Sequence, residues 1–361
     1  MQERLKHLSI LSSDTMKKFL IKLSYTVLPV FLLLFGLTAY LNIYIRPQAT
    51  GDLGRLGFVI IGEDYGQRIE QNELKDTLFE KVRETDDLKN IHVNVLTIGD
   101  SFSQQEHAGY QNYMALEGLT VANTRRDLYD NPIQYSWNIL EAGVVDSTNI
   151  DVMVVEVGER DLAIRIDNFR IDKVEKGEPD MPDIVEEENV WDIRDWSLLR
   201  TRDFLMYRYA GRNPVYDVKL NRDFFDSNEP RRLYFYCADI TNGISIEESV
   251  RPKFKKVFDL LTKKAHERGI ALILMVPVDK YDLYQEYIVD NPYDHPKRIN
   301  EEVRELLGDI PEVLLSKYYL QPLIERGEKD VFLFDNSHWS YKASEAVGKE
   351  LSRRVKMLSN N

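Results

Sequence analysis

A serine and a histidine, each close to an acidic residue, have the types and spacing needed for acyl-transfer chemistry. Ser101 follows Gly99 and Asp100, and His338 stands three residues after Asp335. A serine hydroxyl becomes a nucleophile when a histidine takes its proton, and a carboxylate on the other ring nitrogen orients that histidine. The sequence therefore predicts Ser101 as nucleophile, His338 as its base and Asp335 as the orienting acid. We expect the Ser101 hydroxyl and the His338 ring within hydrogen-bond reach, about 2.6 to 3.2 Å.

Both segments are expected to follow strands of one sheet. The run from Ile91 to Ile98 is rich in β-branched residues, and Val331 to Phe334 is a shorter apolar run. Each run ends directly before its candidate catalytic segment, and the carboxyl ends of parallel strands meet at one edge of a sheet. Either motif alone has a plainer explanation, because a Gly-Asp-Ser turn can cap a helix and a histidine beside tryptophan can be structural. Their pairing favours catalysis.

A third strand end carries further polar residues. The apolar run from Asp151 to Val157 is followed by Gly158, Glu159 and Arg160. We predict that the side chain of Arg160 or Glu159 faces the Ser101 cleft, where a charge could orient a substrate or stabilise an oxyanion. The alternative is a local ion pair that closes the strand.

The remaining pattern predicts an α/β fold, a three-layer α/β/α sandwich with a parallel central sheet. Helices are expected from Asn131-Pro132 to about Ala142, over Phe254 to Ala265, and over Ala343 to Val355, with a strand from Ile270 to Val278. Apolar strands that alternate with helices indicate a parallel sheet covered on both faces. Residues 165–250 fit this alternation poorly and are interpreted as an insertion, either a lid or substrate platform or a solvated loop.

An apolar run near the N-terminus predicts a membrane anchor. Leu23 to Ile45 carries no charge and is about 23 residues long, which is enough to cross a bilayer. Five lysines and arginines precede it, so the N-terminus is expected in the cytoplasm and the catalytic domain outside, in the periplasm or another extracytoplasmic space. A cleaved signal peptide is the alternative.

The predicted order of parts follows from this anchor. We expect a cytoplasmic N-terminus over residues 1–22, a transmembrane anchor over 23–45, a stalk or loosely packed entry segment over 46–90, and a catalytic domain over 91–361 that contains the insertion.

Composition narrows the classes of partner and cofactor. A formal charge of −13 disfavours nucleic acid, which is itself an anion. A single cysteine, Cys237, excludes an intrachain disulfide, and no histidine or acidic cluster has the spacing of a metal site. The sequence thus predicts neither a metal nor another cofactor.

Gly99-Asp100-Ser101 and Asp335-x-x-His338 resemble the first and last blocks of the SGNH/GDSL hydrolase superfamily. With the N-terminal anchor and the Asp-x-x-His-Trp ending, residues 91–356 are similar to its envelope acyltransferase branch, the alginate O-acetyltransferase-like and DltD-like proteins. The family places an Asn after the glycine of its third block, where this chain has Glu159 after Gly158. The resemblance therefore implies an oxyanion hole built from the Ser101 N–H, with Gly109 as second donor and Arg160 as electrostatic substitute.

This resemblance implies a membrane-anchored O-acyltransferase, for which acetyl is the expected group and an envelope or exported polysaccharide the acceptor. A polytopic membrane acyltransferase would then supply the acyl group. An esterase or polysaccharide deacetylase would use the same residues, and a polysaccharide-binding or assembly protein with a degenerate site is the alternative without catalysis.

Overall fold

The computed structural model describes residues 2–60, 63–174, 193, 196–242, 244–293 and 296–359. Its centre is a six-stranded parallel sheet of order β1-β3-β2-β4-β7-β8. Because both faces of this sheet are covered, its central strands are mostly apolar, with Thr97 and Glu156 as exceptions, and every residue of β2 and β4 is buried. The strands are β1 (Glu80–Val82), β2 (Val95–Ile98), β3 (Val121–Thr124), β4 (Val152–Glu156), β7 (Ala271–Val276) and β8 (Val313–Leu315).

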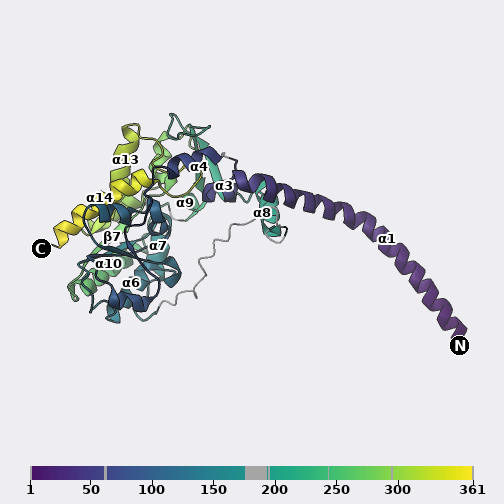
Figure 1. Cartoon of the computed structure of the whole chain (residues 1–361), viewed down its shortest axis with the longest axis horizontal. Coiled ribbons are helices and arrows are strands. Elements are labelled where there is room, and N and C mark those ends of the chain that lie inside the picture. Colours follow the sequence, from purple (N-terminus) through teal and green to yellow (C-terminus); the bar gives the residue numbers. More distant parts are fainter. Residues whose placement is uncertain are drawn as a thin grey trace.

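Two groups of helices cover the two faces, so the α/β sandwich expected from the sequence is present (Figure 1). One face packs on α5 (Tyr110–Leu116), α13 (Lys317–Glu325) and α14 (Tyr341–Leu358). The other packs on α6 (Pro132–Glu141), α7 (Glu159–Asn168), α10 (Arg251–His266) and α12 (Ile299–Leu307).

The strand order contains one reversal that matters for function. From β2 the chain moves outward to β3 and then crosses back to β4 on the other side of β2. In open parallel sheets, ligands bind outside the carboxyl ends of the strands where the order reverses in this way. The carboxyl ends of β2 and β4 are therefore the place at which the fold favours a site.

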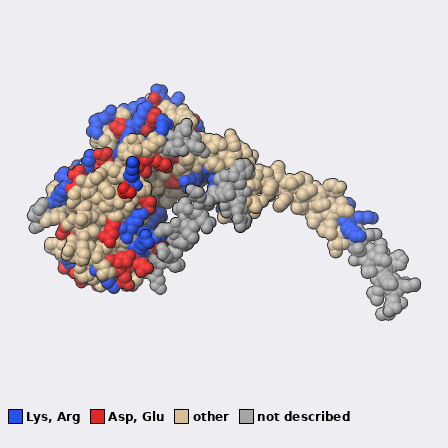
Figure 2. Space-filling view, viewed as in Figure 1, with Lys and Arg blue, Asp and Glu red and all other residues tan. Residues whose placement is uncertain are grey.

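A long N-terminal helix projects from this domain (Figure 1). It comprises α1 (Gln2–Tyr40), a π-helical turn (Leu41–Ile45) and α2 (Arg46–Gln48), and within it Thr15–Gln48 is long and apolar enough to cross a membrane. Figure 2 shows a long stretch of the projecting part free of charged side chains, followed toward the N-terminus by a group of lysines, Lys17, Lys18 and Lys22.

The segment predicted as a loosely packed stalk is instead packed against the domain. It forms α3 (Gly51–Gly57) and α4 (Glu63–Glu70), and Leu53 and Tyr65 belong to the main hydrophobic core. The chain therefore passes from the apolar helix directly into the core.

The predicted insertion contains its own small elements between β4 and β7. These are α8 (Leu198–Ala210), an antiparallel pair formed by β5 (Val215–Lys219) and β6 (Arg232–Tyr236), and α9 (Ala238–Thr241). Its acidic stretch from Lys176 to Asn189 and Trp191 lie outside the described residues.

The strand predicted over Val331 to Phe334 is wrong. Residues Phe332 and Trp339 form an isolated antiparallel bridge, and β8 is the edge strand of the large sheet beside β7. The physical reason is that the carbonyl groups of Leu333 and Phe334 bind the buried Lys280 side chain rather than a neighbouring strand. Lys280, the first residue of α11 (Lys280–Tyr284), therefore holds this segment in place. His338 lies in the tight turn that follows the segment.

Candidate active site

The first candidate segment lies where the strand order reverses. Gly99 follows β2 directly, and a side chain there would meet Glu156, since a Cβ atom would lie 2.8 Å from the Glu156 Cβ. Only glycine allows this approach. The Asp100 carboxylate then accepts a hydrogen bond of 3.1 Å from the backbone N–H of Gly158, which follows β4. This contact ties the two strand ends together at the residue that precedes Ser101.

Glu156, at the last position of β4, forms an acid pair with Asp100. Its Oε2 accepts hydrogen bonds from the Ser103 N–H at 3.1 Å and from the Ser103 hydroxyl at 2.8 Å. Burial, and then the charge of Asp100, raise the pKa of Glu156 well above its usual range. This shift favours the protonated form of Glu156, whose two hydrogen bonds to Ser103 fix the short 3₁₀ helix Ser101–Gln104.

The orientation of the His338 ring is set by Asn336. The Asn336 Oδ1 accepts a hydrogen bond from the His338 backbone N–H at 3.1 Å and lies 2.7 Å from the ring Nδ1. Because this oxygen can only accept, Nδ1 must carry the proton, and Nε2 of the neutral ring keeps a lone pair. Burial lowers the pKa of His338 below 6.5, which favours this neutral form.

The Ser101 and His338 segments pack against each other. The ring of Phe102, the next residue after Ser101, lies 5.0 Å from the His338 ring and 4.5 Å from that of Trp339. Gln105 adds a hydrogen bond of 2.8 Å to the Trp339 carbonyl. The structure thus brings together two motifs that are far apart in the sequence.

The hydrogen bond expected between Ser101 and His338 is not formed in this structure. The His338 Nε2 is buried and has no hydrogen-bond partner among the described residues. Ser101 remains partly exposed at the first position of its 3₁₀ helix. Catalytic hydrogen bonds often close only when substrate is bound, so the vacant lone pair of Nε2 is the group that could take a proton.

Asp335 does not make the contact predicted for it. Its carboxylate accepts a hydrogen bond of 2.5 Å from the Thr50 hydroxyl. The carboxylate near the ring is that of Asp52, whose Oδ2 lies 3.6 Å from the His338 Nδ1. The reason is the tight turn, in which Asn336 reaches Nδ1 first while Asp335 points toward the segment after the apolar helix.

Helix α3 is fitted closely to the histidine turn. Asp52 accepts hydrogen bonds from the Ser337 N–H and hydroxyl, and the Gly54 N–H donates to the Asp335 carbonyl at 3.1 Å. Gly51 has a positive φ of 65°, and a Cβ there would lie 2.6 Å from the Asp335 Cγ. The close approach therefore requires glycine at this position.

Lys280 holds the same turn from the opposite side. Its Nζ is fully buried and donates to the carbonyls of Leu333, Phe334 and Asn336 at 2.6, 2.9 and 3.1 Å. Burial lowers the pKa of Lys280 to about 7, against the opposing charges of Asp335 and Asp52. The His338 turn is thus clamped between α3 and α11.

The backbone N–H groups considered as oxyanion donors differ in whether they are already hydrogen-bonded. The Gly109 N–H is engaged with the Glu106 carbonyl at 3.0 Å, and the Gly158 N–H is engaged with Asp100. Neither is available to an oxyanion in this conformation. The Ser101 N–H opens a 3₁₀ helix, and the first N–H groups of a helix have no partner within it.

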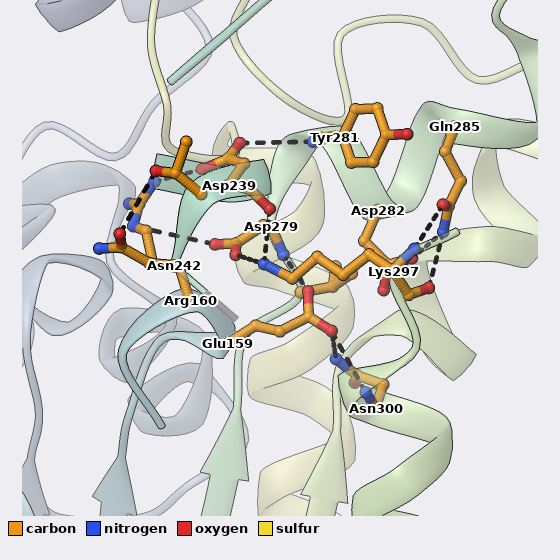
Figure 3. A network of polar contacts seen from close by, with 12 residues as sticks. Glu159, Arg160, Asp239, Asn242, Asp279, Tyr281, Asp282, Gln285, Lys297 and Asn300 are labelled. Atoms are coloured by element: carbon orange, nitrogen blue, oxygen red, sulfur yellow. Dashed lines mark hydrogen bonds and ion pairs between the residues drawn. The ribbon is translucent and has the colours of Figure 1, made fainter. Parts of the chain in front are cut away.

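Glu159 turns away from the cleft, whereas Arg160 lies close to it. Glu159 is buried and accepts hydrogen bonds from the Asn300 side chain and the Asp279 N–H, so its carboxylate is engaged within a separate polar network (Figure 3). Arg160 donates to Asp239 at 2.6 Å, and its positive charge acts to lower the pKa of His338. Arg160 is therefore the residue of this pair that acts on the base.

A buried ionic network fixes Arg160 in place (Figure 3). Two cations, Arg160 and Lys297, share three acids, Asp239, Asp279 and Glu159. Burial and the neighbouring Asp279 raise the pKa of Asp239 to about 7. Burial opposes the charge of Arg160, but Asp279 and Asp239 outweigh it and raise the Arg160 pKa. The guanidinium is therefore charged at all working pH values.

Comparison with known proteins does not assign the chain to a family. No protein-family model, no curated protein and no solved structure matches it. Conclusions about its activity consequently rest on the site itself.

A basic groove of about 560 Å³ opens beside the 3₁₀ helix that begins at Ser101. Two of its cations are paired, Lys81 with Glu106 at 2.5 Å and Arg125 with Asp127 at 2.9 Å. The charge of Arg126, which also lines the groove, acts on His338 by lowering its pKa. The full lining comprises Phe79, Lys81, Arg83, Ser103, Gln104, Glu106, Asn123, Arg125, Arg126 and Asp127.

Sequence reasoning missed three residues that shape the site. Asn336 lies inside the recognised histidine motif and could have been weighed, because its amide is two residues from the ring. Asp52 belongs to a charged segment after the apolar helix, and Lys280 reaches the turn only in the folded chain, so sequence spacing gave neither residue a role at His338. No group of three or more His, Cys, Asp or Glu within the described ranges could hold a metal ion.

Proposed function

We propose that this chain is a membrane-anchored serine O-acyltransferase of the SGNH/GDSL hydrolase superfamily that modifies an envelope or exported polysaccharide. The observation that carries the proposal is the His338 ring, with Nδ1 fixed by Asn336, a vacant buried Nε2, and a ring contact to the residue after Ser101. A neutral imidazole held in this tautomer is the form that a serine nucleophile needs.

In the first half-reaction the Ser101 Oγ attacks the carbonyl carbon of an acyl donor, and its proton passes to the His338 Nε2. The resulting oxyanion is stabilised by the Ser101 N–H and by the positive field of Arg160. When the intermediate collapses, the bond to the donor oxygen breaks and His338 returns its proton to that leaving group. The product is an acyl ester on Ser101.

In the second half-reaction a sugar hydroxyl takes the place of the leaving group. The oxygen of the sugar hydroxyl attacks the acyl carbon, and the His338 Nε2 accepts the hydroxyl proton. The bond from the acyl carbon to the Ser101 oxygen then breaks, and Nε2 returns the proton to Ser101. The acyl group then resides on the sugar and the enzyme is regenerated. Water in place of the sugar would give hydrolysis, so the occupant of the cleft decides between transfer and esterase activity.

The basic groove is an argument that the polysaccharide acceptor carries negative charge. After the two internal pairs are set aside, Arg83 and Arg126 contribute two further positive charges along its wall. This charge is notable in a chain whose overall formal charge is −13. A local positive surface on an acidic protein concentrates anionic ligands.

The experiment that tests the function compares the ester content of purified envelope polysaccharide from wild-type and Ser101→Ala cells. Transfer predicts that ester content falls in the variant, while the amount of polysaccharide stays constant. A variant of the exposed Ser249 serves as control for expression and anchoring. A rise in ester content in Ser101→Ala cells would show a deacetylase and overturn the transferase proposal.

A further inference from the structure

Lys280, the first residue of α11, places a fully buried amino group against the turn that carries His338. Its Nζ donates to the carbonyl oxygens of Leu333, Phe334 and Asn336 at 2.6, 2.9 and 3.1 Å. Three acceptors on one nitrogen require three N–H bonds. An ammonium group has three and a neutral amine has two, so this arrangement is complete only while Lys280 carries its extra proton.

The third of these contacts leads to the ring of the candidate base. The backbone carbonyl of Asn336 accepts from Lys280, and the side-chain Oδ1 of the same residue lies 2.7 Å from the His338 Nδ1. That Oδ1 also accepts from the His338 backbone N–H at 3.1 Å. It is the oxygen that keeps the ring proton on Nδ1 and the lone pair on Nε2. Lys280 therefore acts on His338 through a single residue, Asn336.

The backbone of Lys280 is tied to the buried ionic network of Figure 3. Lys280 follows directly on Asp279, which pairs with Lys297, and the Lys297 Nζ also donates to the Asp239 carbonyl at 3.0 Å. The ring of Phe225 lies 5.3 Å from the Lys280 Nζ. Because these contacts hold the start of α11, a change at the amino group is passed on to the turn.

Two opposing forces decide the charge of Lys280. Burial removes water from the ammonium group and disfavours it. Four acids favour it, and they are Asp335, Asp52, Asp239 and Asp330. The balance lowers the pKa of Lys280 to about 7. The amino group therefore exchanges its proton with solvent within the pH range in which enzymes work.

Two further titratable groups lie against the same turn. The Tyr65 hydroxyl of α4 accepts from the Phe334 N–H at 2.8 Å, and burial raises the pKa of Tyr65. Burial lowers the pKa of His338 below 6.5. Both groups therefore stay neutral as the pH rises above 7. Of the acids that act on Lys280, Asp239 also has a pKa of about 7, so an experiment must separate these two residues.

We propose that Lys280 is a positioning residue for His338: its ammonium group holds the turn so that Asn336 keeps the ring proton on Nδ1, and loss of one ammonium proton releases this hold. The ring can then carry its proton on Nε2, which no longer accepts a proton from Ser101. This inference rests on the proposed function, since it takes His338 as the base. Activity is then confined to a window, with an acid limb set by His338 and an alkaline limb near pH 7 set by Lys280.

Helix α3 limits the release to the part of the turn next to the ring. Asp52 accepts from the Ser337 N–H at 2.7 Å, a contact that does not involve Lys280. The contact of Lys280 with Asn336 is the longest of its three, so it is the one that we expect to be lost.

The turn and the whole fold respond differently to the same proton. Loss of the proton removes the cost of burying a charge, so the folded state as a whole becomes more stable relative to the unfolded chain. The turn, in contrast, loses one hydrogen-bond donor. A loss of activity above pH 7 without unfolding is therefore the signature of this role.

The first test is the pH profile of kcat/KM for an activated ester, with the full-length protein in detergent. Wild-type kcat/KM should fall above about pH 7 by up to about tenfold per pH unit. Lys280→Met has no proton to lose, so its kcat/KM should be at least about tenfold lower at pH 6.5, where the base is misplaced, and should not fall further as the pH rises. Lys342→Met is the matched control, because Lys342 donates to the Lys329 carbonyl at 2.8 Å but lies outside the histidine turn. It should keep the wild-type alkaline limb.

Two outcomes of this test would overturn the proposal. An alkaline limb that persists in Lys280→Met would belong to another group, with Asp239 as the first to examine. A wild-type profile that has no alkaline limb would show that the charge of Lys280 does not act on His338.

The second test depends neither on catalysis nor on a variant of Lys280. The ring-nitrogen signals of nitrogen-15 histidine-labelled protein report which nitrogen carries the proton, and His338→Gln identifies the signals of His338. We expect the proton on Nδ1 at about pH 6.5 and a growing share on Nε2 as the pH rises to about 9. An unchanged tautomer over this range would overturn the proposal. If the tautomer follows pH as expected but no ester is turned over, the proposed function fails while the coupling of Lys280 to His338 stands.

Discussion

The Oδ2 of Asp52 lies 3.6 Å from the Nδ1 of His338, so a residue that follows directly on the apolar helix reaches the candidate catalytic base. The same carboxylate binds the Ser337 backbone and hydroxyl. The position of the base therefore depends on how the N-terminal segment is docked. The apolar helix and the candidate active site are parts of one structure rather than a helix joined to an independent domain.

The first prediction concerns the pH dependence set by Asp52. His338 must be neutral to act as a base, and burial lowers its pKa below 6.5 while the charge of Asp52 partly raises it. The wild type should therefore remain active below pH 6.5. Asp52→Asn removes the raising charge and should move the acid limb of kcat/KM to lower pH by roughly one unit.

Asp335→Asn is the matched comparison for that measurement. An asparagine can still accept the Thr50 hydrogen bond, and Asp335 is not in contact with the ring. Its acid limb should stay where the wild-type limb is. A shift in Asp335→Asn and none in Asp52→Asn would restore the role that the sequence motif assigned to Asp335.

Removal of the Arg160 charge should shift the acid limb of the kcat/KM pH profile in the direction opposite to the shift expected for Asp52→Asn. Its charge lowers the His338 pKa, so Arg160→Ala should move the acid limb to higher pH. The variant should also lose about a hundredfold in kcat if Arg160 stabilises the oxyanion. Turnover of an activated ester across pH measures both effects. Full turnover in Arg160→Ala would remove this residue from the mechanism.

Gly51→Ala should disturb the fit between α3 and the histidine turn. A non-glycine residue at positive φ costs about 1 kcal/mol, and the clash with Asp335 should add about 1–3 kcal/mol. Gly211→Ala is the control, because Gly211 has a nearly equal φ of 66° but open space around it. Unfolding in denaturant and ester hydrolysis should both be affected more by Gly51→Ala, and equal effects would contradict the close packing described for α3.

Lys280 should give the folded state a distinctive pH dependence. Its pKa is about 7 in the folded chain and 10.5 as its ordinary value, so the unfolded chain binds more protons between these pH values. Stability from this residue must then rise with pH across that window. The free energy of unfolding of the wild type, minus that of Lys280→Met, should therefore increase as the pH rises from 7 to 10. A difference independent of pH would contradict the lowered pKa.

The sequence predicted the parts of the fold that carry strong local patterns. Helix α6 begins at Pro132 with Asn131 as its cap, and α10, β4 and β7 lie where apolar periodicity placed them. The strand predicted over Ile91 to Ile98 is shorter, since β2 comprises only Val95–Ile98. The strand β3, with sequence Val-Ala-Asn-Thr, was missed because three of its four residues are polar or small. Its burial comes from the neighbours on either side, which no local pattern shows.

Only the residues that stand in recognisable short sequence motifs could be predicted as part of the site. Ser101 and His338 follow from short motifs, and the structure packs their segments together. The assignment of Asp335 rested on spacing alone and did not anticipate that Asn336 would occupy Nδ1. Asp52 and Lys280 reach the histidine turn through tertiary packing, so sequence spacing carries no information about them.

The most direct test of the account is covalent labelling by a serine-directed fluorophosphonate, followed by intact mass measurement and peptide mapping. The account predicts one label per chain, on Ser101, with no label on Ser101→Ala and a rate at least a hundredfold lower in His338→Gln, where the base is absent. Labelling of another residue, or an unchanged rate in His338→Gln, would contradict the claim that Ser101 and His338 form the nucleophile and base of this protein.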